Sequence, residues 1–244
     1  MYINSSEDGG TFIIKVILIH GFHKKSNDMR PLAKNLASWG YRCYLPDFPL
    51  TFKEFTHSVS LLCELFDDPQ VFNLGENERI HLVGHSTGGL VIRTLLSHTK
   101  YAAKIGKCVL IATPNQGSSL AEMAGRIKLF VHIYKTLRSL TGAYIKGLNL
   151  TNPCQIEVAA IAGNKNNLLL GKLLKNENDG RVEVPSVYYP ELNDFIILPY
   201  GHKEIHHQRE TARLIDAFLR KGRFQIPEEK FSGLEESDFS SPYN

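Results

Sequence analysis

Residues 84–88 read Gly-His-Ser-Thr-Gly and place one serine between two glycines. An apolar run that is typical of a strand precedes them, and a helical pattern follows. A turn this tight forces the serine into a strained backbone conformation and leaves no room for a Cβ at Gly84 or Gly88. The Ser86 hydroxyl then projects from the carboxyl edge of the sheet, above the start of the helix. This context predicts that Ser86 is a nucleophile, and that His85 packs or hydrogen-bonds locally.

An oxygen nucleophile that attacks an acyl group needs two backbone N–H donors for the developing oxyanion. The backbone N–H of Thr87, directly after the nucleophile, is the first candidate donor. Residues 17–22 read Ile-Leu-Ile-His-Gly-Phe and end a strong strand with a His-Gly turn. Phe22 is therefore the second candidate donor, and Gly21 lets the backbone approach the substrate. We interpret His20 as a structural hydrogen-bonding residue beneath this loop.

The carboxylate that orients the base should follow the nucleophile along the chain, and the histidine base should come after that carboxylate. Acids that begin predicted strands lie at the wrong edge of a parallel sheet. Asp179 sits in an Asn-Asp-Gly turn and is the preferred acid, with Glu177 as the alternative. His202 follows the last predicted strand and is the expected base. The other downstream acids are Glu157, Glu183, Glu191 and Asp194.

Two further histidines, His206 and His207, fall within the helix expected over residues 205–219. That position leaves them less free to reach Ser86. His202 and His206 have the i, i+4 spacing of a zinc-binding pair, but no third ligand is placed to complete such a site. We therefore expect no metal and no cofactor.

The elements that position these residues alternate along the chain. This alternation predicts a mostly parallel sheet with helices on both faces. Strands are expected at residues 12–19, 41–45, 79–83, 107–112, 158–162 and 195–198, and helices at 28–39, 52–66, 88–98 and 205–219. We expect a single domain over residues 1–226, followed by an acidic extension over residues 227–244.

Composition excludes several classes of protein. The chain has 244 residues, of which 43% are hydrophobic and 22% charged, which is ordinary globular usage. A net charge of +3 is too small to suggest nucleic acid as a partner. No uncharged apolar stretch is long enough to span a membrane. The four cysteines form no CxxC pair, and no secretion signal is evident, so a cytoplasmic location is expected.

Together these motifs resemble the α/β-hydrolase fold lipases and esterases, over about residues 12–224. The nearest likeness is to bacterial lipase-like hydrolases that are loosely related to GPI inositol-deacylases. The resemblance implies a triad of Ser86, Asp179 and His202, with Phe22 and Thr87 as oxyanion donors. Thr87 replaces the methionine that is common there, which affects pocket shape alone because the donor is a backbone N–H. The matching blocks are residues 18–22, 84–93, 112–118, 161–164, 178–180, 201–202 and 221–224.

Residues 128–140 are amphipathic, and residues 123–155 contain five Lys or Arg and no acid. This segment fits either a cap that admits acyl chains or meets an anionic lipid surface, or an ordinary crossover helix with a solvated basic face. No large lid domain fits between residues 118 and 152. The sequence thus favours a hydrolase of small acyl esters or lipids. A thioesterase, a lipid amidase, an acyltransferase, or a pseudoenzyme that binds lipid or protein remain alternatives.

Overall fold

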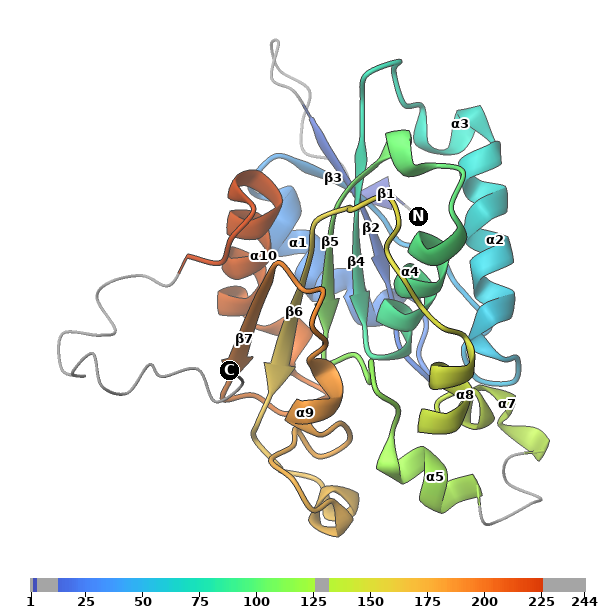
Figure 1. Cartoon of the computed structure of the whole chain (residues 1–244). Coiled ribbons are helices and arrows are strands. Elements are labelled where there is room, and N and C mark those ends of the chain that lie inside the picture. The colour runs from blue at the N-terminus through green and yellow to red at the C-terminus, as the bar shows by residue number, and fades with distance from the viewer. Residues whose placement is uncertain (1, 4–12, 126–131, 226–244) are drawn as a thin grey trace, which may run out of the picture.

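The computed structural model describes residues 2–3, 13–125 and 132–225. Its centre is a seven-stranded sheet in the order β1-β3-β2-β4-β5-β6-β7 (Figure 1). Strands β2 to β7 are mutually parallel, and the edge strand β1 pairs antiparallel with β3. The strands are β1 Tyr2–Ile3, β2 Ile14–Ile19, β3 Tyr41–Tyr44, β4 Ile80–His85, β5 Ile105–Ile111, β6 Val158–Gly163 and β7 Asp194–Leu198.

Helices cover both faces of this sheet, with α1 and α10 on one side and α2 and α4 on the other (Figure 1). The α-helices are α1 Arg30–Ala37, α2 Phe55–Asp67, α3 Pro69–Phe72, α4 Thr87–His98, α5 Ser119–Gly125, α7 Lys135–Arg138, α8 Gly142–Gly147, α9 Val184–Val187 and α10 Arg209–Lys221. Short 3-10 helices are η1 Ser26–Met29, η2 Ala102–Lys104, η3 Leu169–Leu173 and η4 Ile205–His207.

The sheet divides the hydrophobic core into two. Successive side chains of a strand point to opposite faces, so Ile17 and Leu82 pack with the α2 and α4 side, whereas Val16, Leu18 and Val83 pack with the α1 and α10 side. All five are completely buried. Burial on both faces explains why these strands are continuous apolar runs in the sequence. It also fixes the carboxyl edge of the sheet as a rigid support for loops.

All six predicted strands are present, and the expected α/β architecture is confirmed. The prediction of one continuous helix from residue 205 is wrong at its start. Gln208 has an extended backbone (φ −74°, ψ 137°), which separates η4 from α10. His206 and His207 therefore lie in η4 rather than in the long helix.

The connection between β5 and β6 is built, in its described part, from the short helices α5, α7 and α8, without a separate lid domain. Residues 128–131 of the predicted cap segment lie outside the described residues, as does the predicted acidic extension over residues 227–244. Across the described ranges, no helix is both long and apolar enough to cross a membrane.

Candidate functional site

Ser86 occupies the sharp turn between β4 and α4. Its backbone (φ 53°, ψ −124°) is a conformation that non-glycine residues rarely adopt, at a cost of about 1–3 kcal/mol. A Cβ at Gly84 would lie 2.5 Å from the Gly89 nitrogen, and one at Gly88 would strike the Ile19 carbonyl oxygen on the neighbouring strand. The glycines are thus required by close backbone approach, as the sequence predicts.

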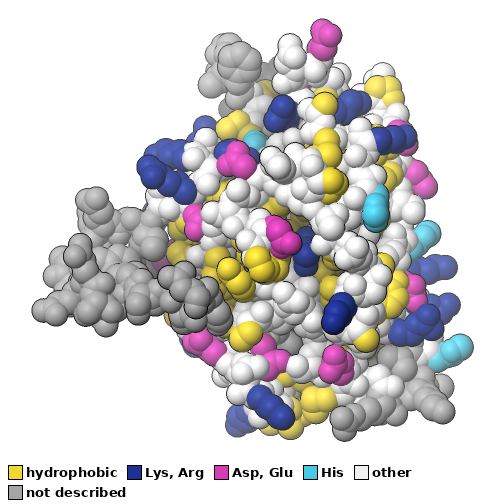
Figure 2. Space-filling view, in the orientation of Figure 1, with side chains coloured by type: hydrophobic (Ala, Val, Ile, Leu, Met, Phe, Trp, Pro, Cys, Tyr) yellow, Lys and Arg dark blue, Asp and Glu magenta, His cyan; other side chains and the backbone are white. Residues whose placement is uncertain are grey.

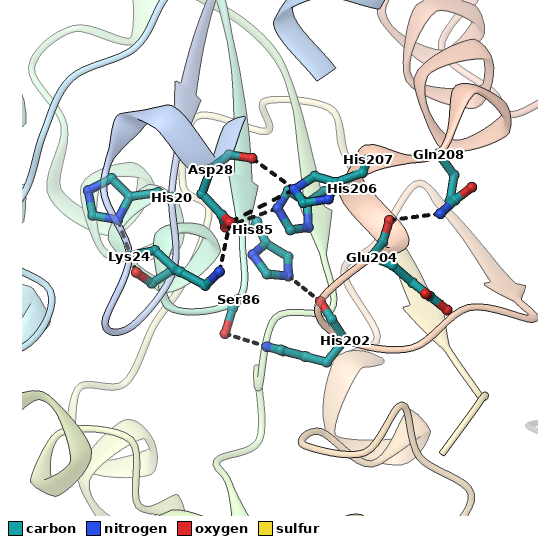
Figure 3. A network of polar contacts seen from close by, with 11 residues as sticks. His20, Lys24, Asp28, His85, Ser86, His202, Glu204, His206, His207 and Gln208 are labelled. Carbon is teal, nitrogen blue, oxygen red and sulfur yellow. Dashed lines mark hydrogen bonds and ion pairs between the residues drawn. The ribbon is translucent and has the colours of Figure 1, made fainter. Parts of the chain in front are cut away.

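Asp179 and His202 reach Ser86 from two other loops at the carboxyl edge of the sheet. Asp179 lies between η3 and α9, after β6, and His202 follows β7. His202 Nε2 is 3.0 Å from Ser86 Oγ, and His202 Nδ1 is 2.7 Å from Asp179 Oδ2 (Figure 3 shows the first contact). The three residues, all buried, form one hydrogen-bonded chain. An ionised carboxylate only accepts, so Nδ1 carries the ring proton and Nε2 faces the serine hydroxyl as an acceptor.

The Asp179 turn is held by its own backbone. Asp179 Oδ1 accepts hydrogen bonds from the N–H groups of Arg181 at 2.9 Å and Val182 at 2.8 Å. Gly180 has φ +94°, a conformation that favours glycine and lets the turn close. The His202 N–H also donates to the Asp179 carbonyl oxygen at 2.8 Å. Carboxylate and imidazole are therefore fixed relative to each other twice, once by side chains and once by main chain.

The alternative acids lie elsewhere. Glu177 is exposed and accepts a hydrogen bond from the Asn164 amide at 2.8 Å. Glu183 contacts Ser119, and Asp194 accepts from the Phe224 N–H at 2.6 Å. Asp179 is thus the acid that contacts His202, whereas Glu177 is not.

The loop after β2 lies directly against the nucleophile. A Cβ at Gly21 would be 2.9 Å from the Ser86 Cβ, and Phe22 lines the cavity beside it. His20 is fully buried beneath this loop, where its Nε2 accepts from the Phe48 N–H and its Nδ1 donates to the Gly21 carbonyl, each at 3.0 Å. Burial lowers the pKa of His20, which matches a neutral structural residue. Thr87 begins α4, where an N–H has no partner within the helix.

A second histidine chain supports the His202 loop from behind (Figure 3). His85 Nε2 donates to the His202 carbonyl oxygen at 3.0 Å, and the His85 ring stacks on His206 at 3.8 Å between centroids. His206 Nε2 in turn lies 3.0 Å from Asp28 Oδ2, while Lys24 Nζ binds Asp28 Oδ1 at 2.8 Å.

Burial holds the pKa of His85 well below its usual value and lowers the pKa of His206 to about 4, so both rings are neutral near pH 7. Burial alone would raise the pKa of Asp28, but its hydrogen bonds to His206 and Lys24 outweigh this and lower it. His85 packs and hydrogen-bonds as expected, but its partners His202 and His206 lie far away in the sequence rather than nearby. The link from His206 to Asp28 could not be predicted, because no sequence signal joins residues almost 180 positions apart.

Asp28, His206 and His207 each offer one potential metal-ligand atom, and these atoms lie within 4.8 Å of one another. The Lys24 ammonium already pairs with Asp28, and the His207 Nε2 donates to the Asp28 carbonyl oxygen at 3.0 Å. The cluster therefore acts as a hydrogen-bonded brace between η1 and η4. His202 lies outside this group and contacts Ser86 and Asp179.

Ser86 and His202 open into a cavity of about 340 Å³. Its walls are mainly apolar, and Arg181 and His23 add polar groups. Tyr134, Leu137 and Leu140 of the predicted cap segment contribute one wall, so its described part borders the site. The remaining lining residues are Phe22, Pro114, Ser118, Leu120, Ala121, Ala124, Leu170 and Val182.

Comparison with known proteins agrees with this architecture. A family model described as alpha/beta hydrolase fold matches residues 15–132. None of the curated protein sequences compared with the chain matches it significantly. Lipase BlEst2 of Bacillus licheniformis, in its mature form, is 20% identical with a TM-score of 0.75, over 92% of this chain and 98% of that protein.

Two larger proteins share the fold at similar identity. The metagenomic carboxyl esterase MGS0156 is 19% identical with a TM-score of 0.63, over 78% of this chain and 64% of that one. Phospholipase PlaB from Legionella pneumophila is 18% identical with a TM-score of 0.59, over 79% of this chain and 53% of its own. The chain thus spans between half and two thirds of these two proteins. The resemblance to lipases and esterases is confirmed at the level of fold: the chain has the α/β-hydrolase fold.

Proposed function

We propose that the protein is a serine hydrolase that cleaves carboxylic esters. The observation that supports this most strongly is the hydrogen-bonded chain of Ser86, His202 and Asp179, of which Ser86 and His202 line an apolar cavity. A hydroxyl, a neutral imidazole acceptor and a buried carboxylate in this order are the parts that acyl transfer through a serine requires.

In this proposal His202 Nε2 takes the proton of Ser86 as the hydroxyl attacks the acyl carbon. Asp179 keeps the imidazole in the correct tautomer and stabilises the cation that forms. The backbone N–H groups of Phe22 and Thr87 donate to the oxyanion of the tetrahedral intermediate. His202 then protonates the leaving alcohol, and water cleaves the acyl-enzyme by the reverse sequence of proton transfers. Every group in this sequence belongs to the chain, the ester or water.

The apolar walls favour an acyl chain as the group that the cavity receives. The names lipase, carboxyl esterase and phospholipase of the similar structures point in the same direction. A thioesterase, an amidase and an acyltransferase would use the same three residues and differ in leaving group or acceptor. Ester hydrolysis is the best-supported member of this group because all three similar structures are named as ester-cleaving enzymes.

The deciding experiment is hydrolysis of p-nitrophenyl esters from acetate to palmitate, with labelling by a fluorophosphonate probe. We expect Ser86→Ala to lower kcat by about 10⁴–10⁶-fold and to abolish labelling. Ser118→Ala, which removes another serine hydroxyl from the same cavity, is the matched control and should retain both. A wild-type protein that neither labels nor turns over any ester, thioester or amide would favour a binding protein over an enzyme.

A reducing, cytoplasmic location forms part of the same proposal. All four cysteines are unpaired, and Cys43 and Cys108 are buried, where loss of solvation raises the pKa of the Cys43 thiol to about 12. Unreactive buried thiols of this kind are usual in a reducing compartment. Fractionation of the source cells with detection of the native protein tests this, and recovery outside the cytoplasm would contradict it.

A further inference from the structure

Three leucines of η3 lie open to solvent beside the cavity. Leu169, Leu170 and Leu173 are 79%, 59% and 56% exposed. They rank among the four most exposed large apolar side chains in the described ranges. Single exposed leucines need no explanation, but three in one short turn form a patch that is costly to keep in water.

This patch is fixed to the candidate catalytic loops. Gly171, in the middle of η3, is buried against the Asp179 turn, where an added Cβ would lie 2.5 Å from the Gly180 Cα. A Cβ added at Gly201, next to His202, would lie 2.7 Å from the Asn167 Oδ1. Figure 1 shows this coil projecting beyond the carboxyl edge of the sheet. Leu170 also lines the cavity, so the exposed patch continues into the space above Ser86.

The same segment is positively charged. Residues 165–175 contain Lys165, Lys172 and Lys175, all exposed, and no acid. Among the described residues none of the three forms an ion pair. Arg181, on the cavity wall, adds a fourth cation. Glu177 is the nearest acid along the chain beyond this segment, and its carboxylate holds the Asn164 amide. Figure 2 shows lysine or arginine side chains beside apolar ones at the lower end of the molecule, the end where η3 lies in Figure 1.

Exposed leucines interleaved with unpaired lysines are the pattern of an interfacial lipid-binding segment. Leucines enter the boundary between headgroups and acyl chains, while lysines remain at the level of anionic headgroups. A folded protein partner would need an apolar pocket and several acidic side chains, each placed to match this short segment. An anionic membrane supplies both an apolar layer and a continuous negative surface, and therefore complements the whole segment.

We propose that residues 165–175 dock the protein on an anionic lipid surface, with Leu169 and Leu173 inserted and the cavity mouth facing the bilayer. This rests on the proposed function in one respect: docking delivers an ester of a membrane lipid to Ser86 through the Leu170 side of the cavity. Binding itself requires no hydrolysis.

The test is co-sedimentation of the full chain with vesicles of phosphatidylcholine alone, or with 30% phosphatidylglycerol added. The Ser86→Ala protein is used, so that hydrolysis cannot alter the vesicles and binding is read independently of activity. We expect binding to the anionic vesicles that weakens with added salt. The double variant Leu169→Ser, Leu173→Ser should bind at least tenfold more weakly, whereas Leu169→Ile, Leu173→Ile should bind normally because it keeps the apolar surface.

Charge is tested in the same assay. Lys172→Glu with Lys175→Glu should abolish the preference for anionic vesicles. Lys34→Glu with Lys104→Glu makes the same change in net charge at exposed sites on α1 and η2, away from the carboxyl edge, and should retain it. In the background with an intact Ser86, all these variants should hydrolyse p-nitrophenyl acetate normally. Failure of Ser86→Ala to bind anionic vesicles, equal binding to both vesicle types, or full binding by the serine double variant would each overturn the proposal. Vesicle binding by a wild-type protein without ester hydrolysis would refute the proposed function alone.

Discussion

Replacement of Asp179 by asparagine is a strict test of the proposed mechanism, because the structure predicts which way the new amide must turn. The present carboxylate accepts three hydrogen bonds: two backbone N–H groups at Oδ1 and the His202 ring at Oδ2. An amide has one accepting oxygen and one donating nitrogen. If the oxygen faced His202, the amide nitrogen would face the N–H groups of Arg181 and Val182.

An amide oxygen turned towards His202 would thus leave the two buried N–H donors of Arg181 and Val182 unpaired, at about 1–3 kcal/mol each. The amide oxygen will therefore stay on the two N–H groups, and the NH₂ group will face His202 Nδ1. The imidazole must then carry its proton on Nε2, where it cannot accept the Ser86 proton. A wrong tautomer of this kind costs a chymotrypsin-type triad about 10⁴ in kcat, or about 5 kcal/mol. We expect a similar loss for Asp179→Asn, with little change in KM.

The assay is steady-state hydrolysis of the best p-nitrophenyl ester, together with thermal unfolding. Because both turn hydrogen bonds survive, the melting temperature should fall by no more than a few degrees. Glu177→Gln makes the same chemical change two residues away on an exposed side chain and should leave kcat unchanged. A kcat for Asp179→Asn within tenfold of the wild-type value would show that Asp179 does not set the His202 tautomer.

Three further predictions concern stability. His206→Ala should cost about 2–4 kcal/mol in urea unfolding, because it removes a fully buried ring and a hydrogen bond to Asp28. His207→Ala should cost under about 1 kcal/mol, because its side chain is 34% exposed; equal effects would contradict the larger role that burial gives to His206. Wild-type stability should fall from pH 6.5 towards pH 4, by up to about 3 kcal/mol from His206 alone, because burial lowers its folded pKa to about 4 while the unfolded chain takes up the proton near 6.5. A flatter pH profile in His206→Gln supports this assignment, and an unchanged slope counts against it. Gly88→Ala should lower the free energy of unfolding by about 3 kcal/mol or more, because its Cβ would strike the Ile19 backbone carbonyl. Gly125→Ala is the control: among the described residues nothing lies close to its added Cβ, so the free energy of unfolding should change by less than about 1 kcal/mol. Differential scanning calorimetry measures both.

Ser86 and its turn could be predicted from sequence because strand, turn and helix are contiguous there. The spacing of the glycines also reflects the lack of room for a Cβ at positions 84 and 88. The position of His202 was predictable for a similar reason, since it directly follows the last apolar run. These are short-range patterns, and local sequence carries them fully. Their catalytic roles stay a prediction until activity is measured.

Asp179 was harder to select because fifteen residues without regular periodicity separate it from β6. Its place is fixed by packing of small residues, Gly171 on Gly180 and Asn167 on Gly201, which leaves no periodic trace in the sequence. The same limit applies to η4. A helical pattern continues through His206, but the tertiary bond from His206 to Asp28 holds that segment in a separate turn.

The double connection between Asp179 and His202 closes a ring of chain around β7. Because the His202 N–H is bonded to the Asp179 carbonyl, that amide hydrogen can exchange with deuterated solvent only when the two loops separate. Separation of the loops after β6 and β7 therefore requires this hydrogen bond to break. The hydrogen-exchange rate of the His202 amide thus reports how often the contact between Asp179 and His202 is broken in the substrate-free protein.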